Sequence, residues 1–106
     1  MRYYKLNDHT PVPCDRDDPE LIHLLTTTKN RQVAYTEVGD IAVSTVFLWI
    51  DPGWDQGKPI LFETMMFKVD WECLDYQERY TTWEAAEAGH ARAVASLGVN
   101  MNLTKS

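Results

Sequence analysis

Residues 32–50, QVAYTEVGDIAVSTVFLWI, contain the clearest hairpin signal in the chain. Apolar and polar side chains alternate before Gly39-Asp40, and a nearly continuous apolar or β-branched run follows them. Glycine in a two-residue connection supplies the positive φ that a tight hairpin turn requires. The stretch therefore predicts two antiparallel strands, 32–38 and 41–50, and the apolar second strand is expected to be central in the sheet.

Two further strands are predicted downstream of this hairpin. Residues 60–68 and 77–80 are rich in β-forming side chains, and the loops 51–59 and 69–76 precede them. The four strands are expected to form an antiparallel meander.

The N-terminal part predicts a short strand and a short helix. Residues 2–6, RYYKL, favour an edge strand, and the prolines of TPVPC (10–14) are expected to stiffen the loop after it. Asp18-Pro19-Glu20 then supplies an N-cap residue, a proline for the first helical position and an acid for the first turn. The apolar residues after it predict a short helix.

The C-terminal segment TWEAAEAGHARAVASL (82–97) predicts a helix, because strong helix formers dominate it. Thr81 and Glu84 match a capping box, and Gly98 predicts the helix end. Gly89 inside the helix predicts a close backbone contact. One stripe at helical spacing is expected to lie on the sheet: Trp83, Ala86, His90, Ala93, Val94 and Leu97.

These elements predict an α+β fold in one domain over residues 1–98. A four-stranded antiparallel meander carries the C-terminal helix on one face, together with the short N-terminal helix. Residues 99–106 are expected to form a loose polar tail. The length of 106 residues suits a single domain.

Charge and composition narrow the function classes. Ten Lys and Arg against sixteen Asp and Glu give a net charge of -6, which disfavours direct binding to nucleic acid or anionic membranes. No signal peptide or membrane span is apparent, and the two cysteines form no metal-binding or redox pair. A cytoplasmic protein without cofactor or metal is expected.

Several segments resemble a family of small, uncharacterised proteins of bacteriophages and prophage-bearing bacteria. They are VSTVFL (43–48), LFETMMF (61–67), ERYTTWEAAEAGH (78–90), MRYYKL (1–6) and TPVPC (10–14). Where that family usually has Leu-Asp-His after the second strand, this chain has Ile50-Asp51-Pro52. The resemblance implies a phage accessory protein in the host cytoplasm. We expect a non-enzymatic protein that binds a host macromolecule and inhibits a defence or regulatory system.

Acidic and aromatic residues in the two long loops are the predicted partner-binding surface. Amphipathic rings give contact area at low entropic cost, and an acidic face can attract a basic partner. The alternative is that the rings cap the core and the acids keep the domain soluble. The residues concerned are Asp51, Trp54, Asp55, Asp70, Trp71, Glu72 and Asp75.

The alternative function is a module, oligomeric if the ligand lies between subunits, that binds and sequesters a small ligand or nucleotide. Glu63 shares an apolar strand face with Met65 and Phe67, where it could bind a ligand or pair with Arg79. Thr45 and Ser44 lie on opposite faces of the neighbouring strand, and either could bond to Glu63. The candidate ligand-binding residues are Thr45, Glu63, Arg79 and His90. His90 on the helix is expected to be structural rather than catalytic. No nucleophile and base pair is recognisable, so no catalytic residue is assigned.

Overall fold

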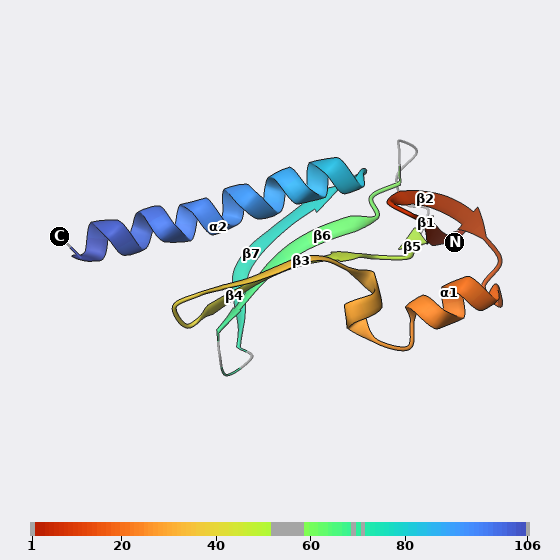
Figure 1. The fold of residues 1–106 in the computed structure, drawn as a ribbon, viewed down its shortest axis with the longest axis horizontal. Helices are drawn as coiled ribbons and strands as arrows, with labels where there is room; N and C mark the ends of the chain where they lie inside the picture. Colours follow the sequence, from red (N-terminus) through yellow and green to blue (C-terminus); the bar gives the residue numbers. More distant parts are fainter. Residues whose placement is uncertain (1, 52–58, 69, 71, 106) are drawn as a thin grey trace.

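The computed structural model describes residues 2–51, 59–68, 70 and 72–105 (Figure 1). Its elements in chain order are β1 (Arg2–Asn7), β2 (Thr10–Cys14), α1 (Pro19–Leu24), the 3-10 helix η1 (Thr28–Arg31), β3 (Gln32–Val38), β4 (Ile41–Phe47), β5 (Ile50–Asp51), β6 (Phe62–Lys68), β7 (Cys73–Tyr80) and α2 (Trp83–Lys105). No helix in the described part is long and apolar enough to cross a bilayer.

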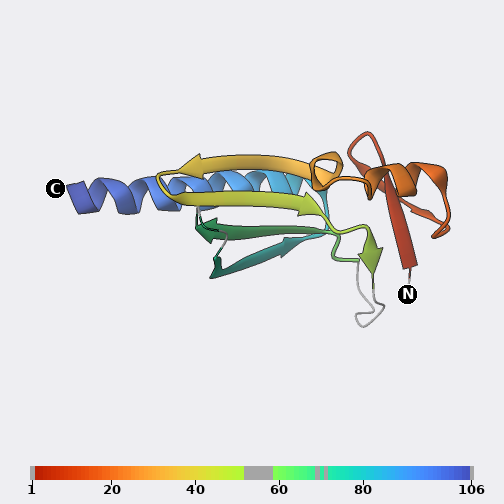
Figure 2. The same ribbon diagram turned by 90° about the horizontal axis from the view of Figure 1, so that it is seen from below.

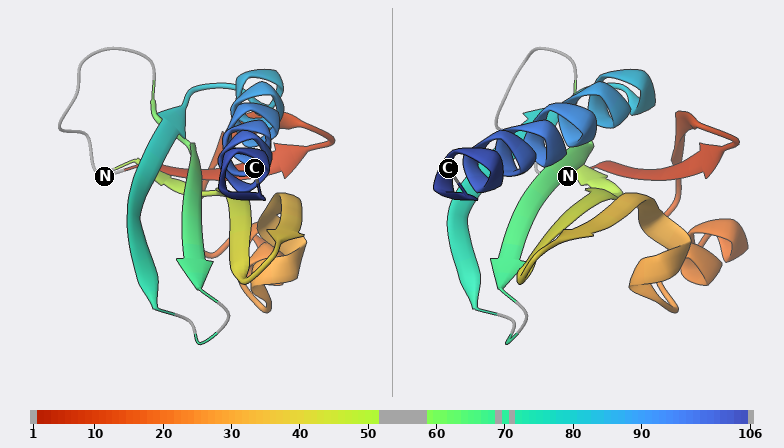
Figure 3. Two further views of the ribbon diagram at one scale, coloured as in Figure 1. Left: turned by 90° about the vertical axis from the view of Figure 1, so that its left-hand side faces the viewer. Right: turned by 60° about the vertical axis from the view of Figure 1, so that its left-hand side comes forward.

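The main sheet has four antiparallel strands in the order β3-β4-β6-β7, and α2 lies across one of its faces (Figure 3). Val38 pairs with Ile41 across the predicted turn, where Gly39 has a φ of 62°. The predicted α+β meander with a helix on one face is confirmed.

A second sheet, which the sequence does not predict, lies at one end of the molecule (Figure 2). Its order is β2-β1-β5, so β1 is central and the expectation of an edge strand is wrong. The TPVPC segment is the strand β2 rather than a loop. Proline lacks an N–H. The strand β2 tolerates two prolines because it is an edge strand, whose backbone forms hydrogen bonds to a neighbouring strand along one side only.

The short helix α1 begins as its sequence predicts. The Asp18 carboxylate accepts a hydrogen bond of 2.8 Å from the backbone N–H of Glu20, and Pro19 occupies the first turn. Lys5 Nζ of β1 lies 3.0 Å from Asp18 and ties the helix to the second sheet. The cap therefore also positions α1 beside β1.

Helix α2 departs from the prediction at both ends. The Thr82 hydroxyl accepts from the N–H of Ala85 at 3.1 Å, so Thr82 is the cap and the expected Thr81–Glu84 capping box is wrong. The helix also continues through Gly98 to Lys105, where a polar tail was expected. A glycine inside a helix costs only about 1 kcal/mol, which does not stop propagation by itself.

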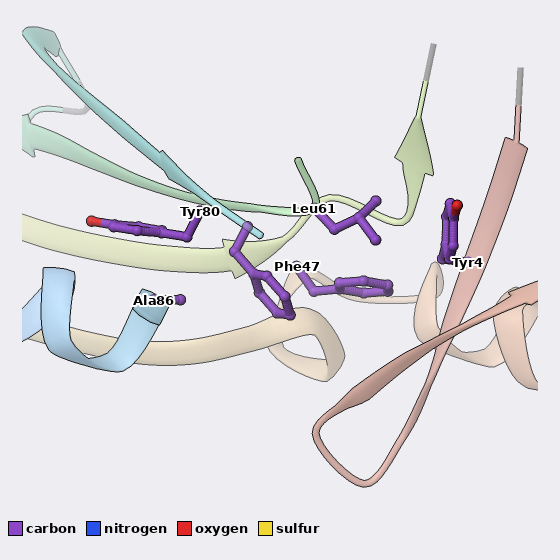
Figure 4. Packing of buried hydrophobic residues seen from close by; sticks show 6 residues of the cluster. Tyr4, Phe47, Leu61, Tyr80 and Ala86 are labelled. Carbon is purple, nitrogen blue, oxygen red and sulfur yellow. The ribbon is translucent and has the colours of Figure 1, made fainter. Parts of the chain in front are cut away.

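The main core lies between α2 and the sheet and continues to β1 (Figure 4). It contains Tyr4, Phe47, Leu61, Phe62, Tyr80 and Ala86. A smaller cluster of Val43, Met66 and Ala93 follows along α2. The predicted helix stripe faces the sheet, with Ala86, His90 and Ala93 buried. Trp83 packs edge-on against Phe62 and stacks on His9 at 3.8 Å.

Candidate functional site

The face of the main sheet away from α2 carries a groove of about 380 Å³. Successive strand side chains point to opposite faces, so Thr64 and Met66 of β6 lie under α2 while Glu63 and Met65 point away from it. The 3-10 helix η1 contributes Thr28 to the lining. The lining residues are Thr28, Gln32, Tyr35, Ser44, Val46, Glu63, Met65 and Phe67.

Among the described residues of this lining, Glu63 alone is charged, and it is 8% exposed. Its Oε2 accepts two hydrogen bonds from β7, one from Gln77 Nε2 at 2.6 Å and one from Arg79 Nε at 2.9 Å. Arg79 lies directly opposite Glu63 in the strand register. The carboxylate is therefore fixed by two donors on one oxygen.

The walls of the groove are mainly apolar. Val46, Met65 and Phe67 contribute aliphatic, thioether and aromatic surface, and Tyr35 is 40% exposed. The Tyr35 hydroxyl donates to Glu37 at 3.2 Å. An apolar pocket with few convergent polar groups is the usual form of a small-molecule site.

The sheet separates the four residues of the predicted ligand set. Glu63 and Arg79 lie on the open face, whereas Thr45 and His90 lie between the sheet and α2. Thr45 is 0% exposed and bonds to Thr64 and His90, so the expected bond to Glu63 is wrong. The physical reason is the strand register, which places Val46 rather than Thr45 opposite Glu63.

Thr45 belongs instead to a buried hydrogen-bonded chain under α2. His90 Nε2 lies 2.9 Å from the Thr36 hydroxyl and Nδ1 lies 2.8 Å from the Thr45 hydroxyl. Thr45 and Thr64 are 2.6 Å apart, and the Tyr80 hydroxyl donates to Thr64 at 3.1 Å. A neutral imidazole offers one donor and one acceptor, which matches two hydroxyl neighbours.

Burial determines which chemistry the hydrogen-bonded residues under α2 can perform. It lowers the pKa of His90 and raises the pKa of Tyr80, because both would have to carry charge in an apolar setting. The Thr45 hydroxyl has the geometry of a nucleophile beside a base, but no solvent reaches it. A substrate could reach it only if α2 separated from the sheet, so the geometry favours a structural role for His90.

The predicted partner-binding residues do not form one surface in the described structure. Asp51 ends β5 at the second sheet, whereas Asp70 and Glu72 follow β6 at its opposite end. Asp75 is exposed on β7, and Glu72 lies 3.6 Å from Lys68. Loops at one end of a sheet were expected, but of the described acids Asp51 precedes β6 in the chain, whereas Asp70 and Glu72 follow it. Trp54, Asp55 and Trp71 lie outside the described residues.

Sequence reasoning named Ser44, Glu63, Met65 and Phe67 but missed the other lining residues, Thr28, Gln32, Tyr35 and Val46. Tyr35, Ser44 and Val46 share the open face with Glu63 because alternate residues of paired strands point the same way. That alternation was a usable signal for each strand, but choosing which face α2 covers needed tertiary contacts. Thr36, Thr64 and Tyr80 of the buried hydrogen-bonded chain could likewise be assigned to the α2 side only from tertiary contacts.

Within the described ranges, no group of three His, Cys, Asp or Glu side chains is placed to hold a metal ion. The chain matches no protein-family model, and neither a curated protein nor a solved structure matches it.

Proposed function

We propose that this chain is a non-enzymatic binding protein that holds a small, largely apolar ligand in the groove on the open face of the main sheet. The observation that carries the proposal is the groove itself, with its apolar walls around the buried carboxylate of Glu63. Its volume of about 380 Å³ falls within the range of about 300–1,000 Å³ that is usual for small-molecule sites. The sequence resembles a family of phage and prophage proteins. A phage protein of this kind would act by sequestering its ligand in the host cytoplasm.

The groove is built on rigid elements, which supports binding rather than general solubility as its role. β3, β4 and β6 supply most of the lining, and β4 and β6 are the two central strands of the sheet. Ser44 and Met65 are cross-strand neighbours in the register. Side chains held in this way keep their relative positions before a ligand arrives, which lowers the entropic cost of binding.

A second candidate is binding of a basic host protein through the acidic end of β7. It is favoured by the exposed Asp70, Glu72 and Asp75, which lie within six residues of sequence. Exposed charges mainly raise association rates and contribute little to affinity, so this surface would need an apolar anchor. Charge reversal at the three acids should then slow association with a basic partner protein and leave the fold intact.

Titration with indole tests the ligand proposal. In ¹H–¹⁵N spectra of the full chain, indole should shift the amide signals of Ser44, Glu63 and Met65. Ser44→Phe should abolish these shifts, because the added ring fills the groove from the central strand. Ala88→Phe is the matched control, since Ala88 is exposed on α2 in the other layer. Shifts elsewhere in the chain, or unchanged shifts in Ser44→Phe, would refute the proposed site.

A further inference from the structure

We infer that the groove selects an organic cation, namely an ammonium group carried on an apolar or aromatic body. The inference rests on the proposed function, because it names the ligand class of the same groove. Its starting point is the carboxylate of Glu63. Both donors of β7 bind Oε2, and Oε1 accepts no hydrogen bond from the residues that the structure describes.

Oε1 of Glu63 sets a requirement on any ligand that fills the groove. A neutral apolar ligand would strip water from a carboxylate oxygen and leave it without a donor, which is costly. A ligand N–H would restore the missing bond, and a charged donor makes the stronger bond to a carboxylate. The hydrogen bonds that Gln77 and Arg79 make to Glu63 both end at the other oxygen, Oε2.

Aromatic surface in the same lining favours a cation further. Tyr35 and Phe67 both line the groove together with Glu63. Cations are attracted to the faces of aromatic rings within about 6 Å, and the attraction grows when water is excluded. Glu37 adds a second carboxylate beside the groove, since it accepts the hydrogen bond of the Tyr35 hydroxyl.

The charge around the groove disfavours anionic ligands, nucleotides included. Among the residues that the structure describes, no lysine or arginine belongs to the lining. Arg79 on the same face is neutralised by Glu63, and Lys29 and Arg31 of η1 stand outside the lining at one end. The whole chain carries -6, so its long-range field also attracts cations.

Three ligands with one indole body test the inference: tryptamine as the cation, tryptophol as the neutral form and indole-3-propionate as the anion. Each is titrated into the full chain at pH 7 and followed through the amide signals of the groove. Tryptamine should bind about fivefold more tightly than tryptophol, and indole-3-propionate should bind weakest. The expected preference is a ratio between ligands, so it is independent of how tightly the shared indole body binds.

Glu63→Gln should reduce the preference for tryptamine over tryptophol to about twofold or less, because only the long-range field remains. Glu78→Gln is the matched control: it also removes one carboxylate paired with an arginine, Arg92, but on the α2 side. Tyr35→Leu provides a second variant at a partly exposed position, should Glu63→Gln disturb the fold. Tyr35→Leu should weaken the binding of tryptamine more than the binding of tryptophol.

The outcomes separate the two claims. Equal binding of the three ligands in the groove, or preference for the anion, overturns the inference and leaves the proposed function standing. Cation preference that Glu63→Gln and Glu78→Gln reduce equally also overturns it, because net charge alone would then explain the result. Absence of groove shifts with all three ligands overturns the inference and the proposed function together.

Discussion

At Gly89 helix α2 packs closely against Tyr80 of β7, and Gly89→Ala should destabilise the protein. A Cβ added at this position would overlap the hydroxyl of Tyr80 and the ring atoms Cζ and Cε1. The Tyr80 ring is buried and its hydroxyl is bonded to Thr64, so the ring cannot turn aside freely. Either the helix must lift from the sheet or the hydrogen bond must break.

The change in unfolding free energy follows from three effects, of which one stabilises the variant and two destabilise it. Helix propensity alone would make alanine more stable than glycine by about 1 kcal/mol. Overpacking a filled site costs about 1–3 kcal/mol, and loss of the Tyr80–Thr64 hydrogen bond costs about 1 kcal/mol more. The overlap outweighs the propensity, and the expected net loss of unfolding free energy is about 1–3 kcal/mol.

Urea unfolding of the full chain measures this loss, with Ala88→Gly as the reference for propensity. Ala88 is exposed on the same helix, so Ala88→Gly should cost about 1 kcal/mol through propensity alone. In a double-mutant cycle, Tyr80→Leu should relieve the overlap, so Gly89→Ala should cost less in that background. A Gly89→Ala variant that is more stable than the parent would refute the close contact between α2 and β7.

Three further changes test the buried face. Because burial lowers the pKa of His90, the unfolded chain binds more protons than the folded one below the ordinary histidine pKa. Stability should therefore fall as the pH drops below about 6.5, by at most about 1.4 kcal/mol per pH unit, and urea unfolding of His90→Gln should lack this contribution. Thr45→Val should lower the unfolding free energy by about 1–3 kcal/mol, because His90 and Thr64 each lose a hydrogen-bond partner. Ser44→Ala on the open face is the control and should change the unfolding free energy by under about 0.5 kcal/mol. Trp83→Ala should cost about 3 kcal/mol, since the ring is half-buried against Phe62, and a loss below about 1 kcal/mol would show that it is not an anchor.

Locally encoded features could be predicted from the sequence. The turn at Gly39 needs only a residue that adopts positive φ, and the cap at Asp18 needs only a carboxylate two residues before an N–H. The second sheet could not be predicted in this way, because Tyr3 pairs with Ile50 across most of the N-terminal half of the chain. The prolines of β2 also argue against a strand unless its edge position is already known.

The candidate site was only partly predictable for the same reason. Glu63, Met65 and Phe67 share a face by alternation alone, and Arg79 is a predicted partner that the register places opposite Glu63. Thr45 is grouped with them in the sequence-based hypothesis because it lies on the neighbouring strand. Its face follows from the pairing of β4 with β6, which depends on where each strand begins.

This alternation also explains why a carboxylate and a buried histidine of α2 can lie on opposite sides of one small sheet. Glu63 and Thr64 are consecutive, yet one faces the groove and the other bonds beneath α2. The α2 side needs small hydroxyls and glycine so that the helix can approach Tyr80, and neutral groups there avoid the cost of buried charge. On the open side, Glu63 lies beside Arg79, with its Oε2 2.9 Å from the Arg79 Nε. The two faces thus meet different demands, packing on one and recognition on the other, and substitutions that test recognition can be made without entering the packed layer.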